Sequence, residues 1–259
     1  MKVPLLVLLI LLVLGAIAGG TWYTMRGSTT VVAAKDARQV VDANEPDTAI
    51  APGDRPASGT WRYTGSGSDS FDALGGDGHT FPAEISAVVE LDADASCEWT
   101  MHVVFVAEHL EERRMCTDGA AVSELGFART TQFLGRRQTS EYVCTDDALR
   151  LPDGAAKGTT WTFTCSEDRG GAVKYTGTHL GEQQVEVGGT QVATTHIRID
   201  GRQDDKSTGD EHSEYWLLPN GLPARFMTDR KLHVKTPLGS MNTTEQWDYT
   251  LALPTPSEP

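Results

Sequence analysis

Hydrophobic and polar residues alternate with a period of two through most of the chain from residue 59 to residue 253. Successive side chains of a strand point to opposite faces of a sheet, so this alternation predicts strands with one buried face. The clearest inward-facing sets are Ile85, Ala87, Val89 and Leu91; Cys97, Trp99, Met101, Val103 and Phe105; Trp161, Phe163 and Cys165; and Met241, Thr243, Trp247, Tyr249, Leu251 and Leu253. We therefore expect a mainly β domain.

Turns rich in glycine and aspartate separate these strands, and no long helical period interrupts them. Further strands are expected over residues 60–64, 125–133, 140–144, 173–179, 192–200, 214–218, 224–228 and 232–235. The pattern allows a helix only over residues 107–115, where a run of glutamate and arginine is compatible with one. Many short strands at this spacing predict a strongly curved antiparallel sheet, either a half-barrel or barrel-like, with few helices.

An uncharged, strongly apolar run occupies residues 3–25. A run of about 23 residues spans a bilayer as a helix that rises about 1.5 Å per residue, and Trp22 and Tyr23 fall where interfacial aromatic residues belong. The small residues before Gly19 also match a signal peptidase site, so cleavage near Ala18 is the alternative to an uncleaved anchor. The run has no cysteine to acylate, which excludes a lipoprotein.

The apolar run sets the expected domain organisation and location. Residues 1–26 form a signal-anchor or signal peptide, and Lys2 keeps the amino terminus cytoplasmic because positive charge resists translocation. Residues 27–58 are rich in Ala, Asp, Pro and Gly and are expected to be a flexible linker. Residues 59–253 form the extracytoplasmic β domain, and the proline-rich residues 254–259 form a disordered tail. We expect a single-pass membrane protein with this domain outside, or a secreted one after cleavage.

The formal net charge of the chain is −14 at pH 7. An acidic surface repels phosphate backbones and anionic lipid headgroups. This charge therefore argues against nucleic acid as a partner and against a face that lies on a bilayer. Most of it is accounted for by ordinary solubilising charge, and the alternative is a specific cationic partner.

Four cysteines, Cys97, Cys116, Cys144 and Cys165, lie inside the expected domain. Outside the cytoplasm an even set of this kind implies two disulfides, and three pairings fit the sequence. We expect sequential pairing, since each consecutive pair flanks one strand-to-strand connection, and we expect the cysteines to face the core. A four-cysteine metal site is disfavoured because no C-x-x-C spacing is present.

Three segments near the carboxyl terminus carry a recognisable pattern: VGGTQVATTHIRI at residues 187–199, YWLLPNGLPAR at residues 215–225 and WDYTL at residues 247–251. The pattern resembles the carboxy-terminal half of LolA-like envelope proteins, a group of β half-barrels that includes mycobacterial lipoproteins binding lipids. The resemblance implies a lipid or acyl chain as ligand in a concave sheet. The cysteines and DALGG at residues 72–76 are also similar to uncharacterised secreted actinobacterial proteins.

The seven histidines are scattered and form no pattern typical of catalysis or metal binding, because none stands in H-E-x-x-H or H-x-H spacing. The chain also lacks a G-x-S-x-G nucleophile motif. The aspartate-rich turns have neither the spaced oxygen donors nor the closing glutamate of a calcium loop. We therefore expect a protein that is not an enzyme, with no catalytic residues, no cofactor and no metal.

The carboxy-terminal strands carry large side chains on one face, and we expect them to form the wall of any ligand site. These residues are Tyr215, Leu217, Phe226, Met241, Trp247, Tyr249 and Leu251. The alternative is that they simply form a closed core, since aromatic residues at strand spacing usually pack against one another.

Two functional hypotheses follow from the sequence. The first is a non-enzymatic envelope protein, tethered or secreted, that binds an apolar ligand in the concave face of its sheet. The second is an extracytoplasmic protein-interaction or sensing module whose partner is another envelope protein. An internal apolar cavity favours the first, whereas a filled core with an exposed patch favours the second.

Overall fold

A computed structural model describes residues 29–41, 55–72, 78–133, 136–168, 171–204, 207–236 and 239–256. Fourteen strands and two short helical turns form within these residues. The helical turns are η1 (Ala34–Asp36) and α2 (Ala37–Val40). The strands are β1 (Gly59–Phe71), β2 (Thr80–Phe81), β3 (Glu84–Leu91), β4 (Glu98–Val106), β5 (His109–Asp118), β6 (Ala121–Phe133), β7 (Arg136–Cys144), β8 (Leu149–Leu151), β9 (Thr160–Glu167), β10 (Ala172–Val187), β11 (Thr190–Asp204), β12 (Ser207–Leu217), β13 (Pro223–Thr236) and β14 (Gly239–Leu251).

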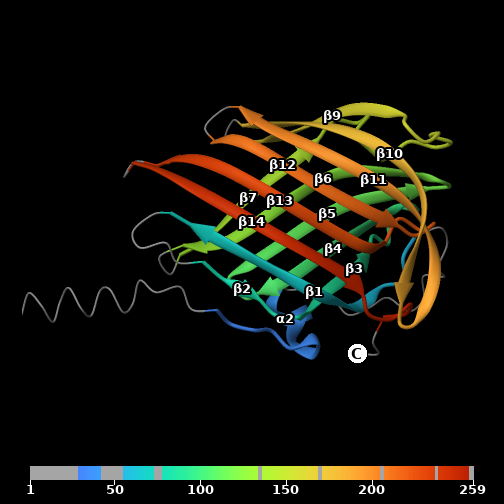
Figure 1. Ribbon diagram of the computed structural model, residues 1–259, viewed down its shortest axis with the longest axis horizontal. Helices are drawn as coiled ribbons and strands as arrows, with labels where there is room; N and C mark the ends of the chain where they lie inside the picture. The colour runs from blue at the N-terminus through green and yellow to red at the C-terminus, as the bar shows by residue number, and fades with distance from the viewer. Residues whose placement is uncertain are drawn as a thin grey trace, which may run out of the picture.

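The strands close into an antiparallel barrel of twelve strands (Figure 1). Sequence neighbours pair around the ring, except that β1 pairs with β3 and β7 pairs with β9. β14 returns to β1 with Tyr63 opposite Leu251 and Phe71 opposite Thr243. β2 pairs only with β1, and β8 pairs only with β6. The predicted curved antiparallel, barrel-like sheet is therefore confirmed. Closure follows from the strong twist of long antiparallel strands, and it removes the unpaired edges that an open sheet would expose.

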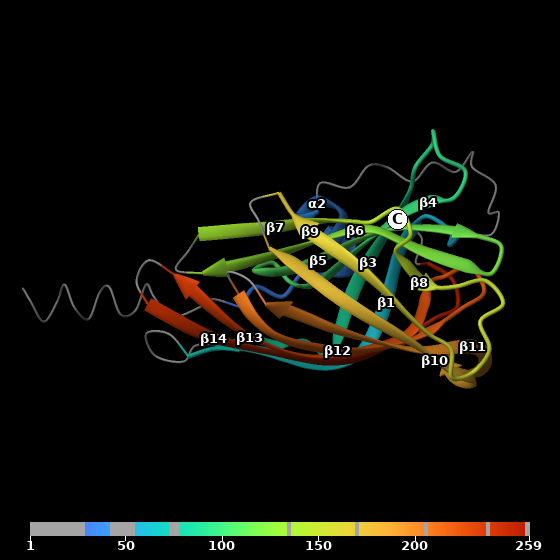
Figure 2. The same cartoon turned by 90° about the horizontal axis from the view of Figure 1, so that it is seen from above.

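The barrel is flattened, so that two layers face each other. Figure 2 shows β4–β7 in one layer and β12–β14 in the layer that faces it. Side chains from the two layers touch: the ring centroids of Phe105 on β4 and Trp247 on β14 are 4.7 Å apart. A round barrel of this many strands would leave a lumen, and flattening lets the opposite walls fill it instead.

One end of the barrel holds a tightly packed apolar core. Trp99 is 2 % exposed and donates its indole N–H to the Thr117 hydroxyl at 3.0 Å. The connection between β12 and β13 covers these residues with the fully buried Leu222. Gly221 in this connection has φ +83°, and a Cβ there would lie 2.8 Å from the Thr117 hydroxyl. A larger residue at this turn would therefore be strained and would push the connection off the core.

The sequence pattern allowed a helix over residues 107–115. This prediction is wrong, because the segment forms most of β5. Glu111 and Arg113 point into the barrel, while Glu112 and Arg114 point outward. Both faces of the strand are charged here, which erased the hydrophobic alternation that revealed the other strands.

The expected flexible linker is also wrong over residues 29–41, which pack against the outside of the barrel. Ala37 on α2 is fully buried against Val88 and Val104, outward-facing residues of β3 and β4. The segment is anchored by Thr30, whose backbone N–H and hydroxyl donate to the Glu108 carboxylate at 2.8 and 2.6 Å. Its few apolar residues had no period of their own, but they match an apolar patch on the barrel.

The predicted apolar run over residues 3–25 and its cleavage site near Ala18 lie outside the described residues, as do residues 42–54 of the expected linker. Among the residues that the structure does describe, no helix is both long enough and apolar enough to cross a bilayer.

Both predicted disulfide pairings are confirmed, Cys97–Cys116 and Cys144–Cys165. The second faces the core as expected, with Cys144 and Cys165 8 % and 0 % exposed. The first is only half-buried, which corrects the expectation. Cys97 lies just before β4 begins, so the alternation along β4 does not determine which way the Cys97 side chain points. Its partner, Cys116, is on the outward face of β5.

Candidate functional site

The seven residues predicted to line a ligand site do share one inward face, on the adjacent strands β12, β13 and β14. Six are buried in the core and Met241 is half-buried. Side chains from the opposite layer cover this wall: Phe105 contacts Trp247 and Tyr249, and the guanidinium of Arg150 lies 4.3 Å above the Tyr215 ring. Where these contacts are made, the wall is part of a packed interior. Binding of a ligand by these residues stays a prediction.

A network of buried charges, which the sequence did not reveal, crosses the middle of the barrel. Arg230 on β13 lies at its centre and is 1 % exposed. Its Nε donates to Glu211 at 3.0 Å, and its Nη1 donates to Glu111 at 2.9 Å and to Glu245. Glu111 belongs to β5 in the facing layer, so the network ties the two layers together.

Three further arginines, on β5, β6 and β8, extend the network. Arg129 on β6 donates to Glu211 across the interior at 2.5 Å. Arg113 on β5 donates to Glu124 at 2.8 Å, and Glu124 also accepts from Arg150. The complete network comprises Glu111, Glu124, Glu211, Glu245, Arg113, Arg129, Arg150 and Arg230. Its four carboxylates balance its four guanidinium groups, which is how a buried ionic cluster avoids an uncompensated charge.

The electrostatics of the network keep Glu111 and Glu211 ionised. Burial raises the pKa of Glu111, but the positive charges of Arg230, Arg113 and Arg129 outweigh burial and hold the pKa at about 2. Burial opposes the shift at Glu211 as well, and the same arginines hold its pKa well below the usual range. In turn, the carboxylates raise the pKa of Arg230 against the effect of burial. These residues are therefore fixed as ions at neutral pH and are unsuited to exchanging protons.

A second polar group lies beside the network, around Asp69 on β1. Its carboxylate accepts from the backbone N–H of His79 at 2.7 Å and from Nδ1 of His79 and of His109 at 2.8 and 2.9 Å. Burial raises the pKa of Asp69, but the hydrogen bonds from His109 and His79 hold it well below its ordinary value. His109 also lies close to two carboxylates of the network. Together with Glu111 and Glu245 it forms the one cluster among the described residues that could hold a metal ion.

The sequence held a signal for the network that hydrophobicity alone could not detect. Glu245 has the same parity on β14 as Trp247, and Arg230 has the same parity on β13 as Phe226. A charged residue at an inward position must find an opposite charge across the barrel. Parity therefore identifies which charges enter the interior, but it does not say which strands will face each other.

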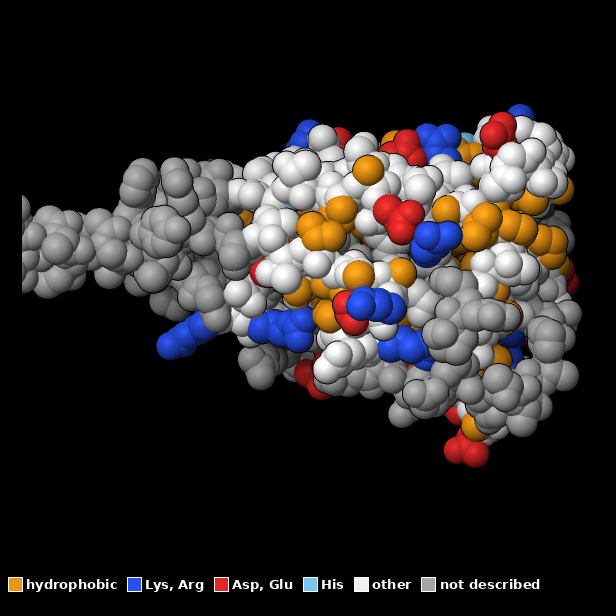
Figure 3. Space-filling view, turned by 90° about the horizontal axis from the view of Figure 1, so that it is seen from below, with side chains coloured by type: hydrophobic (Ala, Val, Ile, Leu, Met, Phe, Trp, Pro, Cys, Tyr) orange, Lys and Arg blue, Asp and Glu red, His pale blue; other side chains and the backbone are white. Residues whose placement is uncertain are grey.

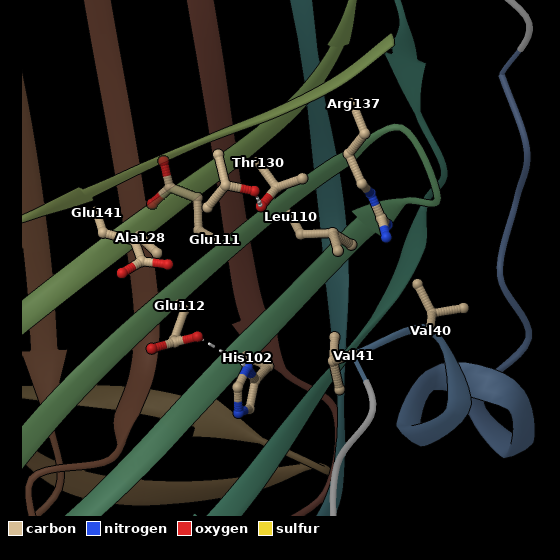
Figure 4. Close-up of a pocket in the computed structure, with 11 residues that line it drawn as sticks. Val40, Val41, His102, Leu110, Glu111, Glu112, Ala128, Thr130, Arg137 and Glu141 are labelled. Carbon is tan, nitrogen blue, oxygen red and sulfur yellow. Dashed lines mark hydrogen bonds and ion pairs between the residues drawn. The ribbon is translucent and has the colours of Figure 1, made fainter. Parts of the chain in front are cut away.

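A pocket on the outer face of the barrel lies between α2 and strands β4–β7 (Figure 4). Its volume is about 170 Å³. The apolar part is formed by Val40, Val41, Leu110 and Ala128, and the polar rim by His102, Glu112, Thr130, Arg137, Thr139 and Glu141. The docked N-terminal segment thus completes a pocket that the barrel alone would leave open on one side.

The rim of this pocket carries charged side chains of both signs. Arg137 is held by the carbonyl of Ala107, to which its guanidinium donates at 3.0 Å. Glu112 is half-exposed and lies 3.7 Å from Nδ1 of His102. Glu141 is exposed and has no ion-pair partner among the described residues. A broader groove of about 710 Å³ on the outer face of β10–β13 is lined by charged and polar side chains of both signs and has no apolar floor.

Comparison with known proteins gives little beyond the structure itself. No known protein family matches the chain, and no curated protein matches it. A solved structure, that of the hypothetical lipoprotein YmcC from Escherichia coli, is similar at 12 % sequence identity with a TM-score of 0.34. The match covers 74 % of this chain and 86 % of that one. The resemblance to LolA-like proteins stays a prediction.

Proposed function

We propose that this protein is a non-enzymatic interaction module displayed outside the cytoplasm, and that it recognises another envelope protein through the outer pocket beside α2. The observation that carries the proposal is the docking of residues 29–41 onto the barrel, which completes a pocket with an apolar floor and a charged rim. The filled interior adds support, because cross-layer contacts occupy the concave space that a ligand carrier would need. Display outside the cell rests on residues 3–25 and on the two disulfides.

The chemistry of the pocket defines the partner that it fits. A cavity of similar volume holds one aromatic ring, so the floor formed with Leu110 and Ala128 accepts one large apolar side chain. The exposed Glu141 on the rim favours a lysine or arginine next to that side chain. Elsewhere on the surface, Figure 3 shows hydrophobic side chains in small patches between polar and charged ones. A single anchor of this size suits a transient contact, because stable interfaces bury larger areas.

Site-specific photo-crosslinking in cells that make the full chain tests the proposal. A photoreactive amino acid at Thr139, on the rim, is expected to give one discrete protein adduct. The same amino acid at Thr162, equally exposed on the outer face of β9, is the matched control and is expected to give none. Ala128→Phe fills the pocket and should abolish the Thr139 adduct without unfolding the barrel. Absence of an adduct from Thr139, or an adduct that survives Ala128→Phe in a folded protein, would contradict the proposal.

A second function, binding of a lipid or acyl chain as in LolA-like proteins, is favoured by one observation. The strands β7 and β9 pair only from Tyr142 opposite Glu167 to Cys144 opposite Cys165. The ring is therefore narrowly joined at this seam, and opening it would give an apolar chain access to the inward wall of β12–β14.

Trp247→Ala separates the second function from a closed core. Trp247 is 5 % exposed and packs against Phe105, and its ring also lies 5.2 Å from the Arg230 guanidinium. If these residues form a closed core, the free energy of unfolding falls by about 3–5 kcal/mol in urea denaturation, with or without a fatty acid. If they form a ligand site, the variant folds normally but loses binding of a fluorescent fatty acid. A wild-type protein that binds no such probe rules out the second function.

A further inference from the structure

Three side chains of types that bind metal ions converge inside the barrel, next to the network. They are His109 and Glu111 on β5 and Glu245 on β14, and their nearest ligand atoms all lie within 4.8 Å of one another. All three residues are buried, with exposed fractions between 1 % and 6 %. The cluster thus bridges the two layers of the barrel.

The orientation of His109 suits it to bind a metal. Its Nδ1 lies 2.9 Å from the Asp69 carboxylate, which can only accept, so Nδ1 carries the proton. The lone pair is then on Nε2, which has no hydrogen-bond partner among the described residues. Histidine ligands of metals are held in this way, with a carboxylate accepting from the other ring nitrogen. The rings of Phe81 and Phe105, at 5.1 and 5.4 Å, fix the imidazole plane.

The carboxylate of Glu245 leaves part of its hydrogen-bonding capacity unused. Arg230 takes Oε2 of Glu245, and Oε1 of that residue has no hydrogen-bond partner within the part of the chain that the structure describes. The network is electrically balanced, while Asp69 adds one negative charge beside it. A bound metal ion supplies the partner that Glu245 Oε1 and His109 Nε2 both lack.

We propose that His109, Glu111 and Glu245 bind one divalent transition-metal ion of the Zn²⁺ class, with Asp69 as the positioning residue of the histidine. One imidazole nitrogen and two carboxylate oxygens match the ligand preference of Zn²⁺ and leave a coordination position for water. The metal links β5 to β14 and thereby fastens the two layers. This inference is independent of the outer pocket and does not require it.

Metal binding by the full chain, purified in detergent after removal of metals, tests the proposal. We expect one Zn²⁺ per chain by calorimetry. His109→Gln and Glu245→Gln should each weaken affinity by at least about 10–100-fold, the loss that removal of an outer-shell partner alone causes. His212→Gln, a matched change on the outer face beside Asp200 and Glu214, should leave the affinity unchanged. Wild-type protein that binds no Zn²⁺, or folded His109→Gln and Glu245→Gln variants with wild-type affinity, overturns the proposal.

A measurement on the wild-type protein covers the case in which the buried variants fail to fold. Co²⁺ replaces Zn²⁺ and reports its ligands through its visible absorption. We expect intense bands of a four- or five-coordinate ion that reach their maximum at one equivalent and that excess Zn²⁺ removes. Weak bands of a six-coordinate ion without a defined endpoint would show surface binding only and would overturn the proposal.

Discussion

Replacement of Arg230 by methionine is expected to cost about 3–5 kcal/mol of folding free energy, because it leaves buried carboxylates without their central cation. Glu211 would keep Arg129 and Glu111 would keep Arg113, but Glu245 would lose the only ion-pair partner that the described residues give it. Urea denaturation of Arg230→Met against wild type measures the loss. Arg62→Ala, which removes an exposed pair 3.6 Å from Glu84, is the control and should cost less than about 1 kcal/mol.

A double variant and a pH series separate charge from packing in the Arg230→Met result. Adding Glu245→Gln removes the stranded charge, so Arg230→Met/Glu245→Gln should be more stable than Arg230→Met alone. Glu111 has a lowered pKa in the folded protein, so its contribution is full above its ordinary value of 4.5 and is lost as pH falls towards about 2. The difference between wild type and Arg230→Met should therefore shrink over this range. A difference that is independent of pH would show that lost packing, not charge, causes the effect.

Strand alternation predicted the barrel well wherever one face was apolar. The set from Met241 to Leu251 has the predicted parity, and its large residues are buried. The failures have a common physical cause. In β5 the inward positions Glu111 and Arg113 are charged and pair with each other. Their closest partners, Arg230 and Glu124, lie on other strands, so no short window of sequence contains the whole set.

The candidate sites escaped prediction for the same reason. Thr30 and Glu108 are far apart in sequence, yet their hydrogen bonds place α2 on the barrel and complete the outer pocket. His109 and Glu245 belong to strands in opposite layers, and only closure and flattening of the barrel bring them together. Spacing motifs find ligands that share a strand or a turn, so they could not find a cluster assembled from β5 and β14.

The two disulfides close loops of similar length but should differ in what they hold in place. Their sequence separations are 19 and 21 residues, so each is expected to contribute about 3 kcal/mol through the entropy of the unfolded chain. Cys97–Cys116 joins β4 to β5, which also pair along their length up to Val106 opposite His109. Cys144–Cys165 lies at the narrow seam between β7 and β9, where the neighbouring pairs Tyr142–Glu167 and Val143–Ser166 and the bond from the Thr145 N–H to the Thr164 carbonyl support it.

Removal of each disulfide as a pair of alanines should therefore lower global stability by a similar amount but open different parts of the barrel. In Cys144→Ala/Cys165→Ala we expect amide hydrogen exchange to accelerate along β7 and β9, because the seam loses its covalent link and little other pairing remains. In Cys97→Ala/Cys116→Ala the acceleration should stay at the ends of β4 and β5. Equal exchange patterns in the two variants would show that the seam is held by side-chain packing across the barrel, and that the disulfide does not control whether the ring opens there.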